Sequence, residues 1–348
     1  MEVLQAARVL GLSIISFLVA LSLTPVVVKI LFRFHFAKQI RSRESAPIFF
    51  ELHKKKENTP TMGGIVIWAT VLGMALVFFA LSYFFGGTFD YLNFVDRAQT
   101  YLPLAAIGIA ALLGFLDDLA GVFRIGPNGG GLKVSQKLVV YMLLALIGGL
   151  WFYYRLDWNV LYIPFFGNMN IGWWYIPIFM FIISASAFSA NETDGLDGLL
   201  GGVALFTFVA LTVVAFALGR YDLATFSGVT VGALLAFLWF NIFPARFFMG
   251  DTGSMALGIT IGVIAMLTNT ALFLPFFAPI LVIESLSVII QVISKKLFGR
   301  KIFLSAPIHH HFEAIGWPES QVTMRFWIIS AVFSALGLSL YFISRFFQ

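Results

Sequence analysis

Long apolar runs dominate the chain, and most of them are long enough to cross a lipid bilayer. A transmembrane helix needs about 20 predominantly apolar residues. The uncharged stretch 252–283 is divided because Asn269, Thr270 and Pro275 interrupt it. Nine or eleven spans stay open as alternatives. The count predicts ten spans, at residues 9–31, 62–85, 101–120, 137–154, 172–190, 197–218, 223–243, 253–270, 276–296 and 326–345.

Composition favours an all-α polytopic membrane protein that forms a single domain over residues 1–348. Hydrophobic residues make up 60% of the chain and charged residues 11%, whereas a soluble domain is about one quarter charged. The mean hydropathy is +0.93. The first apolar segment is too long for a signal peptide and lacks a clear small-residue cleavage site, so we expect a retained span. The absence of cysteine excludes disulfide and thiolate chemistry.

The basic residues gather on alternate loops, which sets the expected orientation. If the loop 32–61 is cytoplasmic, that side carries 17 of the 22 Lys and Arg residues. By the positive-inside rule, both termini then face outward. The cytoplasmic set comprises Lys29, Arg33, Lys38, Arg41, Arg43, Lys54, Lys55, Lys56, Arg124, Lys133, Lys137, Arg246, Lys295, Lys296, Arg300, Lys301 and Arg325; the outward set comprises Arg8, Arg97, Arg155, Arg220 and Arg345.

Several aspartates and a run of histidines fall on the same expected cytoplasmic face. Ionisable groups at a membrane edge are costly and are functional candidates by default. We therefore expect a site on this face. The candidates are Asp117, Asp118, Asp194, Asp197, Asp251, His309, His310 and His311.

Two aspartate motifs lie at the ends of predicted spans. In GFLDDLAG, residues 114–121, Asp117 and Asp118 point about 100° apart if helical, so the two cannot share one role; a solvated helix end is the alternative. In FNIFPARFFMGDTGSMALG, residues 240–258, a helix is expected to start at Asp251. Helix N-termini attract anions and aspartate can hold Mg²⁺, although a simple capped helix start gives the same pattern.

The stretch NETDGLDG, residues 191–198, places acid between two uncharged segments. Asp194 and Asp197 are three apart and are expected to share a helix face. Thr193 or Asn191 is expected to cap the following helix. A tight polar turn between two helices is the alternative, but it leaves the spacing of the two carboxylates without a reason.

Two further segments add basic and imidazole groups. In KKKENTPTMGG, residues 54–64, Lys56 and Thr61 are candidates for phosphate contact; a topology anchor or an anionic-lipid contact is the alternative. In APIHHHFEAIGW, residues 306–317, three consecutive histidines cannot all bind one metal ion in ordinary geometry. They are better suited to bind phosphate or sugar or to orient a partner, and an inert loop stays open.

These groups together suit phosphoryl chemistry at the bilayer edge. Carboxylates with Mg²⁺ and lysine neutralise the charge that develops on phosphate oxygens. No Walker loop or kinase signature is present, so ATP is not the evident substrate. The site suits one lipid phosphate and one soluble phosphate donor, and no nucleic acid partner is expected.

The motifs NTPTMGG, GFLDDLAG, NETDGLDGL, FNIFPARFFMGDTGS and APIHHHFEAIGWPE resemble the phospho-N-acetylmuramoyl-pentapeptide transferase family of the polyprenyl-phosphate N-acetylhexosamine 1-phosphate transferase superfamily. The resemblance runs from about residue 54 to residue 330. It implies transfer of phospho-MurNAc-pentapeptide from UDP-MurNAc-pentapeptide to undecaprenyl phosphate, with Mg²⁺ as cofactor and lipid I and UMP as products. It also implies a ninth span that is broken near its cytoplasmic end, and a homodimer in the bacterial inner membrane.

Residue roles follow from the resemblance by matching position. Asp251 would be a Mg²⁺ ligand, Asp117 the candidate base or nucleophile, and Asp118 its neighbour near the metal. Phe248 matches an aromatic residue that stacks on uracil. The implied substrate-binding set is Lys56, Thr61, Lys137, Asn191, Asp194, Asp197, Asn241, Phe248, His309, His310 and His311.

The chain departs from the family pattern at several positions. Glu192 stands where the family usually has Leu, Asn58 where it has Gly, and Ser135 where Arg is common. The segment 119–131 lacks a lysine often found there. The alternative functions are a sibling transferase for UDP-GlcNAc or another UDP-sugar, a transporter or flippase, and a scaffold without activity.

Overall fold

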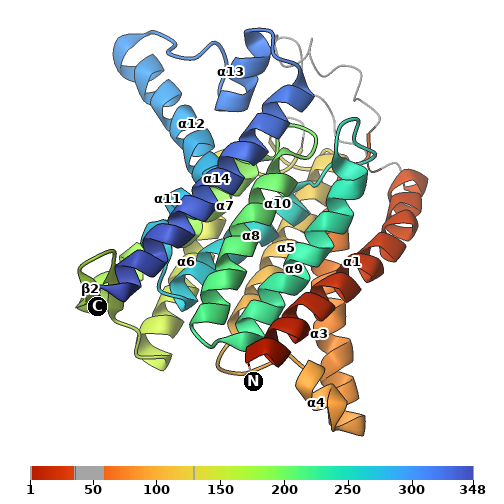
Figure 1. Ribbon diagram of the computed structural model, residues 1–348. Coiled ribbons are helices and arrows are strands. Elements are labelled where there is room, and N and C mark those ends of the chain that lie inside the picture. Colours follow the sequence, from red (N-terminus) through yellow and green to blue (C-terminus); the bar gives the residue numbers. More distant parts are fainter. Residues whose placement is uncertain (1, 35, 37–58, 128–129, 348) are drawn as a thin grey trace.

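The computed structural model describes residues 2–34, 36, 59–127 and 130–347, and it is a bundle of helices (Figure 1). One short antiparallel hairpin of β1 and β2 links α6 to α7, with Ile163 paired with Gly167. The elements are α1 Glu2–Arg33, α3 Ile65–Phe85, α4 Thr88–Leu92, α5 Tyr101–Val122, α6 Val134–Arg155, β1 Val160–Ile163, β2 Gly167–Asn170, η3 Gly172–Trp174, α7 Tyr175–Thr193, α8 Leu199–Ala217, α9 Tyr221–Asn241, α10 Asp251–Leu267, η4 Ala271–Phe273, α11 Leu274–Phe277, α12 Pro279–Phe298, α13 Ile308–Ala314 and α14 Glu319–Phe346.

The helices confirm a polytopic all-α membrane protein. Among the described residues, eight helices are long and apolar enough to cross a membrane, α11 and α12 form a bent pair, and α10 is a shorter apolar helix. The chain therefore has a helical counterpart for every predicted span, while the ten-span count itself stays a prediction. The division of 252–283 is confirmed, because α10 ends at Leu267 and η4 starts at Ala271.

Helices α8, α9 and α10 form the centre of the bundle. They are apolar on nearly all sides and largely buried, as expected for helices surrounded by other helices. Helix α9 packs against α1 and α8, and α10 packs against α5 and α7. Both chain ends lie at one end of the bundle, and α13 lies at the opposite end (Figure 1). This arrangement agrees with the expectation that both termini face the same side.

Glycines let α10 start in close contact with two neighbouring helices. A Cβ atom added at Gly114 of α5 would lie 2.2 Å from the carbonyl oxygen of Asp251. A Cβ atom added at Gly64, just before α3, would lie 2.3 Å from the Cα atom of Gly253. Small residues allow this backbone approach between membrane helices. They hold the first turn of α10 directly beside the carboxyl end of α5.

The broken helix pair lies elsewhere than expected. Helices α11 and α12 meet at Ala278 with a bend of 92°. The break is thus near the start of the predicted span 276–296, and the prediction of a break near its cytoplasmic end is wrong. The carbonyl oxygen of Phe277 accepts hydrogen bonds from Thr207 of α8 and Ser334 of α14, both at 3.0 Å. Neighbouring hydroxyls therefore satisfy the backbone that the break exposes.

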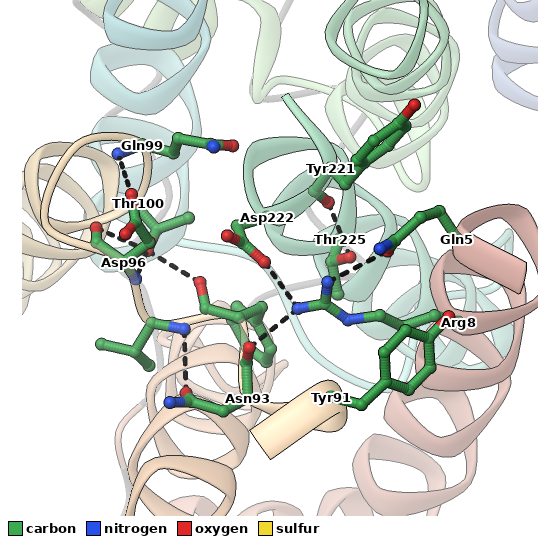
Figure 2. Close-up of polar contacts among 12 residues, drawn as sticks. Gln5, Arg8, Tyr91, Asn93, Asp96, Gln99, Thr100, Tyr221, Asp222 and Thr225 are labelled. Carbon is green, nitrogen blue, oxygen red and sulfur yellow. Dashed lines mark hydrogen bonds and ion pairs between the residues drawn. The ribbon is translucent and has the colours of Figure 1, made fainter. Parts of the chain in front are cut away.

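A buried arginine near the start of α1 ties this helix to the rest of the bundle (Figure 2). One terminal nitrogen of Arg8 donates to Asp222 of α9 at 2.6 Å and to the carbonyl oxygen of Asn93 at 2.8 Å. The other donates to Gln5 at 3.2 Å, and the guanidinium lies over the ring of Tyr91, 5.4 Å from its centroid. The clamp joins three parts of the chain that are distant in sequence.

Candidate active site

Two carboxylates and one lysine meet where α5 ends and α10 begins. The Nζ atom of Lys137 lies 2.9 Å from Oδ2 of Asp117 and 2.5 Å from Oδ2 of Asp251. The side chains are 14%, 3% and 17% exposed, respectively. These are therefore largely desolvated charges, and their mutual pairing is what makes the burial tolerable. Lys137 lies in the first turn of α6, so three helices contribute to the cluster.

The remaining oxygens of the two carboxylates are also bonded. Oδ1 of Asp251 accepts a hydrogen bond of 2.5 Å from the Asn191 side chain, which also donates to the hydroxyl of Ser254 at 3.2 Å. Oδ1 of Asp117 accepts one of 2.6 Å from the backbone N–H of Leu132. Each carboxylate is thus held in a fixed orientation by two segments other than its own helix, which preorganises the pair.

Asp118 points away from this cluster, as the angle between adjacent helical residues predicts. Its Oδ2 atom accepts a hydrogen bond of 2.9 Å from the backbone N–H of Thr252, one of the N–H groups that a helix start leaves without an intrahelical partner. The Thr252 hydroxyl donates to the carbonyl of Ala111 at 3.0 Å and accepts from the Trp68 indole at 3.1 Å. Asp118 therefore joins the first turn of α10 to α5, whereas Asp117 faces Lys137.

Two buried hydroxyls near the cluster have no hydrogen-bond partner within the described part of the chain: Thr61 Oγ1 and Tyr141 Oη. Thr61 lies beside Gly250 and Asp118, since a Cβ atom at Gly250 would approach both. Tyr141 interacts electrostatically with Asp251, Lys137 and Asp117. Unsatisfied buried hydroxyls call for an explanation such as a bound ion, water or ligand.

Tyr141 was not identified as a site residue from the sequence. Its position four residues after Lys137 puts both side chains on one face of α6, and this spacing is the signal that could have identified it.

The 194–198 segment is a turn, not a helix. Helix α7 ends at Thr193, and Gly198, with φ of +74°, precedes α8 without a side-chain cap. The expected helix face shared by Asp194 and Asp197 is therefore wrong, and so is the expected cap from Thr193 or Asn191. Asp194 and Asp197 both lie in the five-residue connection between α7 and α8, outside either helix.

Asp197 stabilises this turn. Its Oδ2 atom accepts a hydrogen bond of 3.0 Å from the backbone N–H of Ala245, and its own N–H donates to Glu319 at 2.7 Å. Asn241 acts similarly: its amide donates to the Phe247 carbonyl at 2.7 Å and accepts from the Gly198 N–H at 3.0 Å. Both side chains hold backbone segments that border the cluster.

Phe248 is half-buried, and its backbone pairs with the 60–63 segment. Its N–H donates to the Pro60 carbonyl at 2.7 Å, and its carbonyl accepts from the Gly63 N–H at 2.7 Å. This pairing brings Thr61 next to the MGD turn before α10. Lys56 lies outside the described residues.

The three histidines lie on the short helix α13 and have different surroundings. His309 Nδ1 lies 2.9 Å from Glu284 of α12, and His310 Nδ1 lies 2.7 Å from Glu313. His311 Nδ1 accepts a hydrogen bond of 3.3 Å from the Leu304 N–H. Neither glutamate was singled out from the sequence. Of the two, Glu313 could have been found by its i, i+3 spacing from His310.

His309 is buried and reaches the 194–198 turn. A Cβ atom at Gly195 would lie 2.2 Å from His309 Nε2, and this nitrogen has no hydrogen-bond partner among the described residues. Burial lowers the pKa of His309, but the carboxylate of Glu284 outweighs it and holds that pKa above the ordinary value; Glu313 and Glu192 act in the same direction. The carboxylate of Glu284 therefore favours the protonated form of His309.

The carboxylate pair fits a magnesium ion. Mg²⁺ is usually bound through one or two carboxylates together with waters and substrate phosphates, and Asp117 and Asp251 offer that donor set. Among the described residues, no group of three or more His, Cys, Asp or Glu side chains is placed to hold a metal ion alone. Substrate oxygens and water would have to complete the coordination. The unsatisfied hydroxyls of Thr61 and Tyr141 agree with a site that takes further polar groups.

Comparisons with known proteins show that the sequence is similar to one family. The model for Glycosyl transferase family 4 matches residues 100–269, and the phospho-N-acetylmuramoyl-pentapeptide-transferase signature 1 matches residues 56–67. The phospho-N-acetylmuramoyl-pentapeptide-transferase of Anoxybacillus flavithermus is 39% identical over 325 residues, which cover 93% of this chain and 95% of that protein. Those of Geobacillus sp. (strain WCH70) and Clostridium perfringens (strain SM101) are 40% and 39% identical over 342 and 346 residues, covering 96% and 97% of this chain and 98% and 99% of the relatives.

Proposed function

Because this chain belongs to the phospho-N-acetylmuramoyl-pentapeptide-transferase family, we propose that it transfers phospho-MurNAc-pentapeptide from UDP-MurNAc-pentapeptide to undecaprenyl phosphate. The products are lipid I and UMP, and the step belongs to peptidoglycan synthesis. The observation that carries the proposal is similarity over almost the whole length of chains with that name. The Asp117–Lys137–Asp251 cluster supplies groups that phosphoryl transfer requires.

In the proposed reaction, an oxygen of the lipid phosphate attacks the phosphorus that carries the sugar. The bond from that phosphorus to the bridging oxygen breaks, and UMP leaves with that oxygen. Asp117 acts as the base that removes the proton from a monoanionic lipid phosphate. A two-step route, in which Asp117 first takes the phosphosugar and then passes it to the lipid, uses the same residues.

Positive charge and orientation come from the rest of the cluster. Asp251, oriented by Asn191, and Asp117 would hold Mg²⁺, which when bound neutralises charge on the diphosphate oxygens. Lys137 adds a positive charge next to the same oxygens. Asp118 positions Asp251 indirectly, because it holds the first turn of α10, on which Asp251 lies.

The groups around the cluster are proposed to bind the donor. The half-buried ring of Phe248 is suited to stack on uracil, and Lys56 and Thr61 to contact the uridine side. Asp194, in the turn after α7, stays a candidate for the nucleotide. Asp197 and Asn241 contribute by shaping the same turn. His309, with His310 and His311, would face the phosphosugar.

We propose a bacterial inner membrane location with the site on the cytoplasmic face. Support comes from the bias of 17 basic residues to that side and from the position of both chain ends at the opposite end of the bundle from α13 (Figure 1). The lipid acceptor would reach the site from the bilayer itself. The homodimer stays a prediction.

The test is UMP release by the full chain in detergent or nanodiscs. We expect release from UDP-MurNAc-pentapeptide with undecaprenyl phosphate and Mg²⁺, loss of release on metal chelation, and a fall of about 10²-fold or more in Asp117→Asn and Asp251→Asn. Release from UDP-GlcNAc alone would instead assign the chain to a sibling activity. Full turnover of Asp251→Asn with Mg²⁺ would refute the metal assignment.

A further inference from the structure

Lys137 occupies the position that a cation bridging the two carboxylates would take. Its ammonium lies between Oδ2 of Asp117 and Oδ2 of Asp251, at 2.9 and 2.5 Å. The other oxygen of each carboxylate already accepts a hydrogen bond, from Leu132 and Asn191 respectively. The two oxygens that face each other across the cluster are therefore the ones that Lys137 holds.

A divalent cation held by this pair of carboxylates would use those same oxygens. Mg²⁺ binds carboxylate oxygens at about 2.0–2.1 Å, which is closer than the ammonium approaches them. An ammonium and a divalent cation bound to one pair of oxygens would lie within a few ångströms of each other in a largely desolvated site, where like charges repel strongly. The geometry therefore does not accommodate both cations at once.

We propose that Lys137 and the divalent cation compete for the Asp117–Asp251 pair. This inference rests on the proposed function, since it concerns the metal that the transfer reaction would use. Lys137 keeps the two carboxylates together before the metal binds, and metal binding displaces its ammonium from the pair. The displaced charge stays near the site and is then available to an anionic substrate.

The surroundings of Lys137 allow this displacement. Lys137 lies in the first turn of α6, and its side chain is a flexible stem that can swing without moving the helix. The unsatisfied hydroxyl of Tyr141, one turn further along the same helix, offers an acceptor for the ammonium. Without metal, the Lys137 ammonium also offsets the repulsion between the two adjacent carboxylates.

The consequence is that removal of the lysine charge should tighten metal binding. An adjacent charge changes the binding of another cation, the proton, to a carboxylate by one to three pKa units, so we expect Lys137→Met to bind Mn²⁺ at least about 10-fold more tightly than wild type. Lys133→Met removes the same charge one turn earlier, from an exposed position, and should leave the affinity unchanged. Lys137→Gln, a second substitution that keeps a polar side chain, should also tighten binding.

The experiment is a titration of the purified full chain with Mn²⁺, in which free Mn²⁺ is counted by EPR and Mg²⁺ is used as competitor. Asp251→Asn combined with Lys137→Met should abolish the tight site, which locates it at the pair. Tightening in both Lys137 variants but not in Lys133→Met supports the competition. Unchanged or weaker Mn²⁺ binding in both Lys137 variants, in samples that are folded by circular dichroism and monodisperse, overturns it.

The transferase function and the competition between Lys137 and the metal can be refuted separately. The Mn²⁺ titration needs no substrate, so competition can be observed even if UMP is never released; only the proposed function would then fail. Conversely, Mg²⁺-dependent UMP release together with unchanged Mn²⁺ affinity in both Lys137 variants would leave the proposed function standing and remove the competition.

Discussion

Replacement of Gly114 by alanine should displace the catalytic end of α10. The added Cβ atom would lie 2.2 Å from the Asp251 carbonyl oxygen and 2.7 Å from the Thr252 Cα atom, where ordinary contact begins at 3.4 Å. Both neighbours are backbone atoms, which cannot turn aside as a side chain can. Helix α10 must therefore move from α5 by about 1 Å, and Asp251 moves with it.

The cost should appear in turnover more than in folding. Overpacking of this kind costs about 1–3 kcal/mol in stability, whereas a misplacement of about 1 Å near the chemistry can lower the rate by about 10²-fold. Gly121→Ala is the matched control, because it lies on the same helix and a Cβ atom there meets nothing within 4 Å. The assay is the rate of UMP release, alongside thermal unfolding, for both variants. A Gly114→Ala protein with turnover within twofold of Gly121→Ala would refute the argument that backbone contact positions Asp251.

Three further predictions follow from single contacts. Asp118→Ala should lower turnover more than Asp118→Asn, because an asparagine oxygen can still accept the Thr252 N–H; equal rates of UMP release in the two would contradict this. The His309–Glu284 pair stabilises the fold fully below the unfolded imidazole pKa, about 6.5, and loses this effect as pH rises through the higher folded pKa. The melting temperature of wild type relative to Glu284→Gln should therefore fall from pH 6 to pH 9, and a flat difference would refute the pairing. Arg8→Met should lower the free energy of unfolding by about 3 kcal/mol. This is the lower end for removal of one partner of a buried pair, because the Asp222 side chain is 25% exposed. Arg8→Lys should cost less, and an unchanged free energy of unfolding in Arg8→Met would show that the Arg8 contacts do not stabilise the fold.

The apolar runs predicted the helices well because hydropathy reports one strong constraint, the satisfaction of the backbone within lipid. The start of α10 at Asp251 was expected from the motif at 240–258, and the division of 252–283 from Asn269, Thr270 and Pro275. The bend at Ala278 was not expected, because it depends on Thr207 and Ser334, hydroxyls from two distant helices that satisfy the freed carbonyl of Phe277. The residues 271–279 themselves give no indication of these two hydrogen-bond partners, so the bend could not be predicted from them.

The aspartates of the candidate site could be predicted from the sequence, but several of the contacts between site residues could not. The angle between Asp117 and Asp118 indicated different roles, and the structure gives them different partners. The helix face expected for the 194–198 segment was wrong, because residue spacing suggests a shared face only where a helix forms. Glu284 was missed because it is one acid within an apolar span, 25 residues from His309 in sequence.

The acids can persist in an apolar bundle because each is bonded to an element other than its own. Asp117 is held by α6 and the Leu132 N–H, Asp118 by the first turn of α10, and Asp197 by the Ala245 N–H. A buried carboxylate without such partners would be strongly destabilising, so these bonds make the acids possible and also fix their positions. The same bonds make the geometry depend on how the helices pack. A glycine such as Gly114, which carries no chemistry, therefore has as direct an influence on the placement of Asp251 as the residues that contact its carboxylate.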